Sequence, residues 1–150
     1  MEVYRICLEK WSARLSASGQ SARWNSRGKY VVYTAQSRAL ACLENVVHRS
    51  GEGLNALFRV MVIEIPAAVS LQEVDPAGLP DDWPDYARYT HCQAIGDRWL
   101  AAGTTAVLRV PSAIIARESN FLINPAHPDF GRIHLVARED FRFDPRIKSV

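Results

Sequence analysis

The sequence predicts an α+β domain in which two helices lie among about six to eight short strands. Apolar side chains recur at helical spacing in two stretches, near residues 38–50 and 90–102. Shorter stretches are rich in β-branched and aromatic residues and are bounded by glycine or proline, as strands are. The chain has 150 residues, 48% of them hydrophobic, which is enough for one domain with its own core.

The first third of the chain is expected to form a strand, a loop, a second strand and a helix. Residues 3–8 fit a first strand, and residues 12–28, rich in Ser, Ala and Gly, fit a loop. Residues 29–35, KYVVYTA, have the β-branched and aromatic composition of a strand. Ser37 can then cap a helix that ends near Ser50–Gly51.

The middle of the chain carries the strongest strand pattern and a long irregular segment. Residues 57–65, LFRVMVIEI, predict a strand that Pro66 ends. Residues 69–74 fit another short strand. Residues 75–89 contain three prolines and a glycine, and loops of this length within a compact domain tend to be lids or binding surfaces.

The last third is expected to open with the second helix, over residues 90–102. Thr90 can cap this helix and Gly103 can end it. Residues 121–130 contain two prolines and are expected to form an ordered loop. The remaining strands are predicted at residues 104–110, 132–137 and 141–143.

Glu44 is an anomaly on the first predicted helix. At about 100° per residue it lies about 40° from Leu40 and about 60° from Val47, on the stripe that should face the core. A carboxylate in such a place is costly unless something pairs with it. Glu44 is therefore either part of a structural ion pair or a working group at the edge of a pocket.

Composition and charge argue against several classes of protein. There is no run of eighteen apolar residues and no apolar leader core, so neither a membrane span nor a signal peptide is expected. Three scattered cysteines without CxxC spacing argue against a disulfide framework or a zinc site and fit a reducing cytoplasm. A net charge of +2 is too small to indicate nucleic-acid binding.

The cations are nonetheless concentrated near the N-terminus. Eight of the 18 Lys and Arg residues lie in the first fifty positions, where only three acidic residues occur. This imbalance would suit a small molecule that carries phosphate. A merely solvated basic surface explains it equally well.

Several motifs resemble those of the RES domain family. Arg23 in ARWNS, Glu44 in ALACLENVVH and Ser112 in RVPSAII resemble the arginine, glutamate and serine that give this family its name. The resemblance continues, in order and over nearly the whole chain, through YRI, VVYTA, GDRWL, NPAHPDF and FRFDPR. It implies a single RES domain over residues 1–150, with a split, antiparallel-rich sheet like that of ADP-ribosyltransferases and a few flanking helices. RES proteins are typically bacterial toxins that consume NAD.

The resemblance also suggests a role for each motif residue. Cleavage of the nicotinamide–ribose bond needs stabilisation of positive charge on the sugar, for which Glu44 is the candidate. Tyr33 would offer its ring to the flat nicotinamide, unless it is simply a core residue. Arg5 and Arg23 would bind the pyrophosphate through forked hydrogen bonds, although surface positions are the default for arginine. Ser112 would hydrogen-bond the substrate or the Glu44 region, or else only stabilise its turn.

Other residues near these motifs are expected to be structural. Trp24 and Asn25 would support the turn that carries Arg23. Asn124 and His127 would hold an ordered loop, or else border the site. Arginine-modifying ADP-ribosyltransferases carry an acidic residue two positions before the catalytic glutamate, where this chain has Cys42, so transfer to arginine is disfavoured. No metal signature is present, and without GxGxxG or a P-loop no Rossmann-type binding of NAD is expected.

Two functions remain in competition. The first is a cytoplasmic toxin that cleaves NAD with water, phosphate or a protein as acceptor, and that an Xre-type helix-turn-helix antitoxin inhibits by covering the pocket. The resemblance also implies toxin homodimers inside a larger toxin–antitoxin assembly. The second is a non-catalytic module that binds a nucleotide or a partner protein. An RNA-cleaving toxin is disfavoured, because the chain is barely basic and offers no convincing paired histidines.

Overall fold

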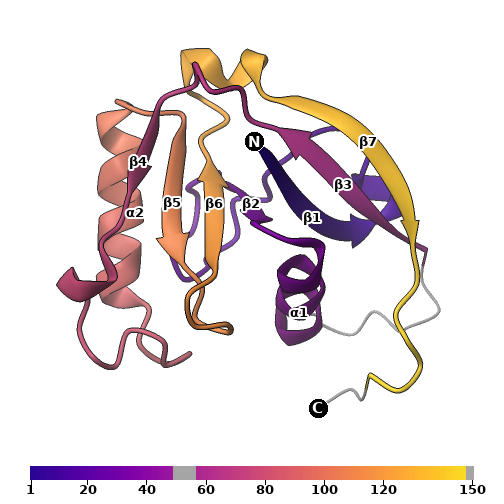
Figure 1. Cartoon of the computed structure of the whole chain (residues 1–150). Coiled ribbons are helices and arrows are strands. Elements are labelled where there is room, and N and C mark those ends of the chain that lie inside the picture. The colour runs from indigo at the N-terminus through magenta and orange to yellow at the C-terminus, as the bar shows by residue number, and fades with distance from the viewer. Residues whose placement is uncertain (49–56, 148–150) are drawn as a thin grey trace.

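The computed structural model describes residues 1–48 and 57–147, which form one mixed sheet of seven strands and two α-helices (Figure 1). Side by side, the strands are β4 (Leu71–Glu73), β5 (Val107–Pro111), β6 (Ser119–Ile123), β2 (Val32–Ala35), β1 (Glu2–Leu8), β3 (Phe58–Glu64) and β7 (His134–Phe141). Neighbouring strands are antiparallel except β4 and β5, which are parallel. The predicted α+β class is confirmed.

The sheet is split between β1 and β2. These strands share one register pair, Tyr4 with Ala35, whereas β1 pairs with β3 along seven residues. The strands β4, β5, β6 and β2 therefore form one half of the sheet, and β1, β3 and β7 form the other. In Figure 1 the two halves run at an angle to each other. The split, antiparallel-rich sheet expected from the family resemblance is thus present.

The first helix, α1 (Arg38–His48), begins where the sequence predicts. The Ser37 hydroxyl accepts a hydrogen bond from the backbone N–H of Leu40 at 3.1 Å, as an N-cap side chain should. Leu40 and Ala41 are buried against β1 and β3. The predicted end of the helix at Ser50–Gly51 lies outside the described residues.

The second helix, α2 (Thr90–Ala102), has the predicted bounds. Gly103 ends it in the left-handed conformation, with φ of 58°, which glycine adopts without steric cost. The predicted cap at Thr90 is wrong: the N-cap position is Tyr89, and no side chain caps the helix there. Three short 3-10 helices complete the described elements, at Glu9–Trp11, Pro76–Gly78 and Pro128–Arg132.

Four strand predictions need correction. β5 occupies Val107–Pro111, so it begins three residues later than the predicted strand at 104–110. β2 begins at Val32, so only the second half of the stretch 29–35 is paired. β6 occupies Ser119–Ile123, where the sequence suggests the start of a loop, because the prolines that indicate a loop follow the strand. The segments 132–137 and 141–143 do not form separate strands but contribute to the single strand β7. β7 lies at the sheet edge, where polar residues such as Arg138 are tolerated.

Both helices pack on the same face of the sheet. Side chains alternate along a strand, so Tyr33 and Ala35 of β2 share a face. Ala35 belongs to the apolar cluster beneath α1, and Tyr33 packs beside the cluster beneath α2. The opposite face holds a third apolar cluster, built from Val3, Val32, Met61, Ile63, Val107, Phe121 and Ile123 with neighbouring loop residues. The two helices therefore cover the same face of the sheet, each over its own apolar cluster.

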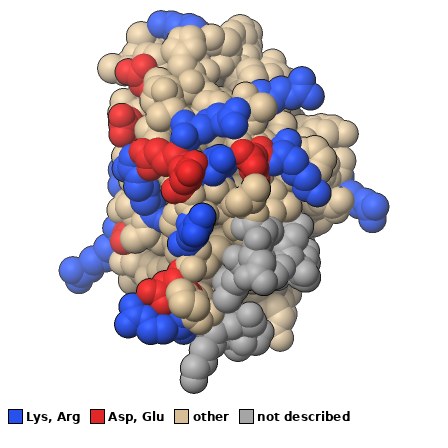
Figure 2. Space-filling model, turned by 90° about the vertical axis from the view of Figure 1, so that its right-hand side faces the viewer, with Lys and Arg blue, Asp and Glu red and all other residues tan. Residues whose placement is uncertain are grey.

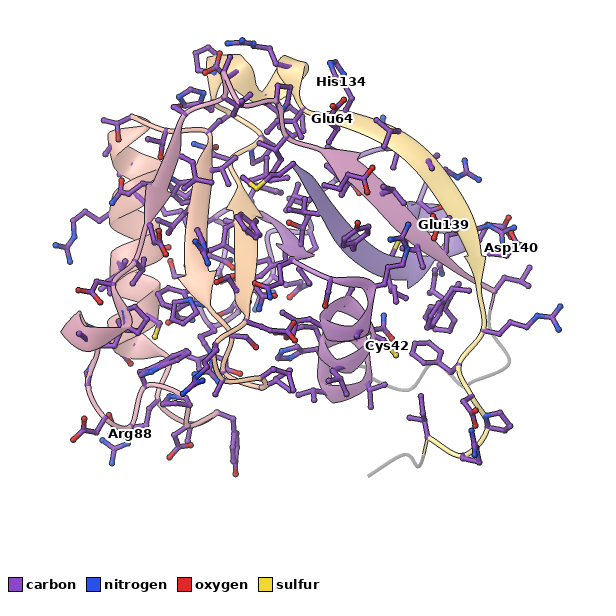
Figure 3. All side chains as sticks on the ribbon, viewed as in Figure 1. Cys42, Glu64, Arg88, His134, Glu139 and Asp140 are labelled. Atoms are coloured by element: carbon purple, nitrogen blue, oxygen red, sulfur yellow. The ribbon has the colours of Figure 1, made fainter. Side chains whose placement is uncertain are left out.

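Acidic and basic side chains are interspersed on the side of the molecule that carries β7 (Figure 2). Arg38 of α1 pairs with Glu139 at 2.6 Å, and Arg59 of β3 pairs with Asp140 at 2.6 Å. Figure 3 shows Glu139 and Asp140 projecting from the same stretch of β7. On this side, arginines are thus matched by acids from the C-terminal strand.

Candidate active site

A cavity of about 280 Å³ opens where β1 and β2 diverge. Residues 4–6 of β1 and residues 33–35 of β2 line it, because the strands separate there and expose consecutive residues of both. Helix α1 and the turn before β2 supply further walls. The volume is close to the lower end of small-molecule pockets, about 300 Å³. The predicted residues Glu44, Tyr33, Arg23 and Arg5 all belong to this wall.

Glu44 projects from α1 into the cavity wall, and its side chain is 24% exposed. Its Oε1 accepts a hydrogen bond from Nδ2 of Asn120 at 2.6 Å, and its Oε2 lies 3.3 Å from Nε2 of His48. Within residues 1–48 and 57–147, no lysine or arginine forms an ion pair with it. A structural ion pair between Glu44 and an arginine or lysine is therefore absent among these residues, and the basic side chain in contact with Glu44 is His48. The carboxyl group borders a cavity instead.

Tyr33 contributes its ring to the same wall while its hydroxyl is engaged elsewhere. The hydroxyl donates to Oδ1 of Asn25 at 2.7 Å and accepts from the backbone N–H of Trp24 at 3.2 Å. Burial raises the pKa of the Tyr33 phenol above its ordinary value, so the group stays protonated. Tyr33 thus joins the cavity to the turn that carries Arg23, and its ring is left as the surface available to a flat ligand.

The turn before β2 is organised by Asn25, whose side chain is almost completely buried. Its Nδ2 donates to the carbonyl oxygens of Gln20 at 2.7 Å and Lys29 at 3.0 Å, and its Oδ1 accepts from Tyr33. Trp24 is also buried, in the cluster beneath α2. The predicted roles of Trp24 and Asn25 in packing and turn support are confirmed.

Helix α2 holds this turn from behind. Gln93 Nε2 donates to the Ala22 carbonyl oxygen at 2.9 Å, and Asp97 Oδ1 accepts from the backbone N–H of Ser26 at 3.0 Å. Gly96 lies between them, so close to the turn that a Cβ there would stand 1.8 Å from the Trp24 carbonyl oxygen. The motif GDRWL on α2 therefore packs against the turn formed by the motif ARWNS and supports it.

Arg23 connects the cavity to the long segment 75–89. Its guanidinium donates to the carbonyl oxygens of Trp83, Pro84 and Asp85, the last two at 2.9 and 3.2 Å. It also lies over the ring of Tyr89, 4.6 Å from the centroid. Arg23 is thus placed at the cavity but already bound to this segment, and contact with a phosphate would need some of these bonds to be exchanged.

Arg5 and Ser112 lie at the margins of the site. Arg5 shares a face of β1 with Val3, and its Nη1 donates to the Ser16 carbonyl oxygen at 2.7 Å. Burial lowers the pKa of this guanidinium. The Ser112 hydroxyl accepts from the backbone N–H groups of Ile114 and Ile115, both at 3.1 Å, so its turn-stabilising role is observed. Contact of either residue with a ligand stays a prediction.

A second cavity, of about 550 Å³, adjoins the first beyond the end of β5. The two cavities share Pro111 and Ala113 in their walls. Ser112 lines the second cavity, together with Trp83 and Arg109. Ser112 thus stands beside the cavity that contains Glu44 but does not line it.

Sequence reasoning did not single out several polar residues of the first cavity, among them Asn45, His48 and Asn120. His48 lies one helical turn after Glu44, a spacing that could have indicated contact. Asn120 comes from β6, and only the pairing of β6 with β2, opposite Ala35, brings it to Glu44. No local pattern in the sequence carries that information.

Other candidate ligands have local roles. Asn124 Oδ1 accepts from the backbone N–H of Ala126, and His127 Nδ1 accepts from that of Asp129, both at 3.0 Å. Their predicted role in holding an ordered loop is confirmed. Among the described residues, no group of three His, Cys, Asp or Glu side chains could hold a metal ion, and no helix is long and apolar enough to cross a membrane.

The chain has close relatives among known toxins. The "Prs ADP-ribosylating toxin" of Sphingobium sp. (strain YBL2) is 41% identical over 127 residues, covering 83% of this chain and 79% of the relative. A protein named "Toxin Res" from Yersinia enterocolitica is 31% identical, covering 99% of this chain and all of the relative. "Toxin Res" of Photorhabdus laumondii is 34% identical, covering 98% and 97%.

A solved structure and a family model agree with these similarities. A chain in the crystal structure of the M. tuberculosis MbcT–MbcA toxin–antitoxin complex superposes with a TM-score of 0.75 at 20% identity, covering 94% of this chain and 84% of that chain. At this identity the likeness concerns the fold. The model of the RES domain matches residues 2–144. The chain therefore belongs to the RES domain family.

Proposed function

We propose that this protein is the toxin of a bacterial type II toxin–antitoxin pair, and that it consumes NAD by cleaving the bond between nicotinamide and ribose. The observation that carries the proposal is the position of Glu44, a carboxyl group held by Asn120 and His48 at the wall of a cavity. The names of the relatives, two of them "Toxin Res" and one an ADP-ribosylating toxin, support it.

The reaction needs little acid catalysis from the protein. When the bond from the sugar's anomeric carbon to the nicotinamide nitrogen breaks, the electron pair leaves with the nitrogen, and nicotinamide departs as a neutral molecule. Positive charge grows on the sugar, and an acceptor with a lone pair then bonds to the anomeric carbon and loses its proton. A carboxylate beside the sugar stabilises the growing charge, and in a cavity poor in water this effect is stronger. Glu44 has that role in the proposal.

The other predicted residues would bind and orient the dinucleotide. The Tyr33 ring would stack on nicotinamide, because its hydroxyl is already fixed by Asn25 and Trp24. Arg23 and Arg5 would meet the pyrophosphate with charge-assisted hydrogen bonds. Ser112 would hydrogen-bond the substrate from the neighbouring cavity.

Water, phosphate or a protein side chain could each be the acceptor. The Sphingobium relative is named an ADP-ribosylating toxin, and this name favours a protein as the acceptor of ADP-ribose. Transfer to arginine is disfavoured, because Cys42 stands two residues before Glu44 and packs against the apolar cluster beneath α1. Figure 3 shows Cys42 on the side of α1 that faces the segment after β7.

Partner and setting complete the proposal. An enzyme that consumes NAD harms its own cell, so we infer a cognate antitoxin of the Xre helix-turn-helix type that covers the cavity. The MbcT–MbcA structure, a toxin–antitoxin complex, supports such a partner. We further propose one RES domain over residues 1–150, a homodimer within the assembly, a cytoplasmic location, and no dependence on metal, membrane or direct contact with nucleic acid.

The test is release of nicotinamide from NAD by protein made in a cell-free system. We expect wild-type protein to release nicotinamide and Glu44→Gln to release none while keeping its unfolding temperature. Glu64→Gln is the matched control, because Glu64 is exposed at the far end of β3, beside His134 (Figure 3). Wild-type protein that binds NAD without releasing nicotinamide would instead be the non-catalytic module, and a fully active Glu44→Gln variant would refute the role of Glu44.

A further inference from the structure

The first cavity is too small for a whole dinucleotide. Its volume of about 280 Å³ is near the lower end of the pockets that hold small molecules, about 300–1,000 Å³. NAD is a large ligand for such a pocket, since it joins two nucleosides through a pyrophosphate. If the nicotinamide-side ribose lies against Glu44, as the proposed function requires, the adenosine half must therefore lie outside this cavity.

The second cavity, of about 550 Å³, adjoins the first at Pro111 and Ala113. Arg23 lines the first cavity, and its guanidinium donates to the carbonyl oxygens of Trp83 and Pro84, which both line the second. The guanidinium that is expected to meet the pyrophosphate therefore lies at the boundary between the two cavities. A dinucleotide with its pyrophosphate at this boundary has one nucleoside on each side.

The wall of the second cavity offers an aromatic ring and a guanidinium, each held in place by the protein. The ring is that of Trp83, which packs with its centroid 6.1 Å from that of Trp24. The guanidinium is that of Arg109 on β5, whose Nε donates to Ser119 Oγ at 3.0 Å and whose Nη1 lies 3.3 Å from Glu73. Adenine suits this pair, because it is a flat base that stacks on aromatic rings and carries acceptor nitrogens at its edge.

The charge of this wall favours a nucleoside over an anionic acceptor such as inorganic phosphate. Two carboxyl groups, those of Glu73 and Glu118, line the cavity together with two guanidinium groups, those of Arg109 and Arg117. Positive and negative charges are thus equal in number there, and a free phosphate ion would meet both carboxylates. Adenosine carries no charge, and its ribose hydroxyl groups are donors that carboxylates can accept.

We propose that the second cavity is the subsite for the adenosine half of NAD, with the adenine ring stacked on Trp83 and within hydrogen-bond reach of Arg109. The inference rests on the proposed function and adds to it the residues that bind the part of the substrate remote from the broken bond.

Arg109 allows this subsite to be changed without altering the site of bond cleavage. Among the described residues, its side chain interacts with Ser119, Glu73 and the ring of Phe121. Neither Arg109 nor any of these three partners lines the cavity that contains Glu44. Its side chain is also 40% exposed, so its removal leaves little empty space in the core.

The test measures binding of the two halves of the substrate separately. Isothermal titration calorimetry gives the Kd of adenosine monophosphate (AMP) and of nicotinamide mononucleotide (NMN) for each protein. Arg109→Ala should raise the Kd of AMP about tenfold, as expected for a partly exposed charge-assisted hydrogen bond, and should change the Kd of NMN by less than about twofold. Its kcat/KM for release of nicotinamide from NAD should fall by the same factor as its affinity for AMP.

Trp83→Ala tests the stacking surface. Loss of a base stack should raise the Kd of AMP by about 5- to 150-fold. Trp83→Phe keeps an aromatic ring and should bind AMP within about threefold of wild type. Arg109→Ala keeps the test informative if Trp83→Ala fails to fold, since Trp83 also packs in the cluster beneath α2.

Arg132→Ala is the matched control. Like Arg109, Arg132 is a partly exposed arginine in an ion pair, 3.2 Å from Asp129, but it lines neither of the two cavities described. This variant should leave the Kd of both fragments and the kcat/KM for NAD unchanged.

Three results would overturn the inference. AMP that does not bind wild type, or that binds all variants equally well, would mean that the adenosine half lies elsewhere. Equal weakening of AMP and NMN by Arg109→Ala would mean that this residue only supports the fold. A lower kcat/KM for NAD with unchanged binding of AMP would assign the cavity to the acceptor. Failure of the proposed function is separate: wild type would then release no nicotinamide, whereas binding of AMP needs no bond cleavage.

Discussion

Replacing Gly96 with alanine is the sharpest test of how the structure supports its cavity. The added Cβ would stand 1.8 Å from the carbonyl oxygen of Trp24 and 2.8 Å from its carbonyl carbon. Real Cβ atoms essentially never come within 3.0 Å of such an atom, so α2 and the turn must separate by more than about 1.2 Å. The contacting group is the Trp24 backbone and not the end of a flexible side chain, so no small side-chain movement can relieve the clash.

The size of the effect follows from the bonds that this separation breaks. The bonds from Gln93 to Ala22 and from Ser26 to Asp97 are 2.9 and 3.0 Å long and would stretch beyond hydrogen-bond distance. Each is worth about 0.5–1.5 kcal/mol, to which overpacking adds about 1–3 kcal/mol. Alanine regains about 1 kcal/mol of helix propensity over glycine. We expect a net loss of about 1–5 kcal/mol in the free energy of unfolding.

The assay is urea unfolding, followed by circular dichroism, with nicotinamide release measured on the same samples. Gly131→Ala is the control, because nothing lies within 4 Å of a Cβ at that position, and its stability should stay within about 0.5 kcal/mol of wild type. Nicotinamide release by Gly96→Ala should also fall, since the displaced turn carries Arg23 and fixes Tyr33. A Gly96→Ala protein as stable as wild type would refute this reasoning.

Three further substitutions test individual contacts of the site. Tyr33→Phe loses the bonds to Asn25 and Trp24 and should lower stability by about 1–2 kcal/mol at pH 7. Burial raises the pKa of Tyr33 in the folded protein, so the stability that this residue contributes is lost as pH rises above about 10. In urea unfolding, the difference in free energy of unfolding between wild type and Tyr33→Phe should therefore become smaller above that pH. A difference that does not change with pH would contradict the raised pKa of Tyr33. Arg23→Lys cannot bridge several carbonyl groups, so limited proteolysis within residues 75–89 should become faster, and an unchanged rate would show that Arg23 does not hold this segment. Ser112→Ala should cost about 1 kcal/mol in thermal unfolding through its lost turn bonds, and a rise in KM for NAD beyond that of an equally destabilised variant would add a substrate contact to its role.

The local elements of the fold could be predicted because their signals lie within a few consecutive residues. Ser37 caps α1 and Gly103 ends α2 as expected from their side-chain chemistry and backbone freedom. The bounds of β3 differ from those of the predicted strand by one residue at each end, since a run of buried β-branched residues is hard to mistake. β6 was harder to predict because it is short, begins with polar residues and leads into a proline-containing loop.

The site could be predicted only in part. Spacing and family resemblance indicated Glu44, and the anomaly that singled it out, a carboxylate on an apolar stripe, corresponds to a real cavity wall. The partners of Glu44 and Arg23 could not be predicted, because they come from segments distant in sequence. Asn120 lies 76 residues after Glu44, and the carbonyl groups that bind Arg23 lie 60 to 62 residues after it.

The central claim is that the Glu44 carboxyl group stands beside the sugar whose bond to nicotinamide is broken. A crystal structure of the Glu44→Gln variant with NAD tests this most directly, because the substrate should stay uncleaved. We predict that the nicotinamide-side ribose lies between β1 and β2, with its anomeric carbon against the side chain at position 44. A dinucleotide bound only in the second cavity, or away from both cavities, would contradict the account.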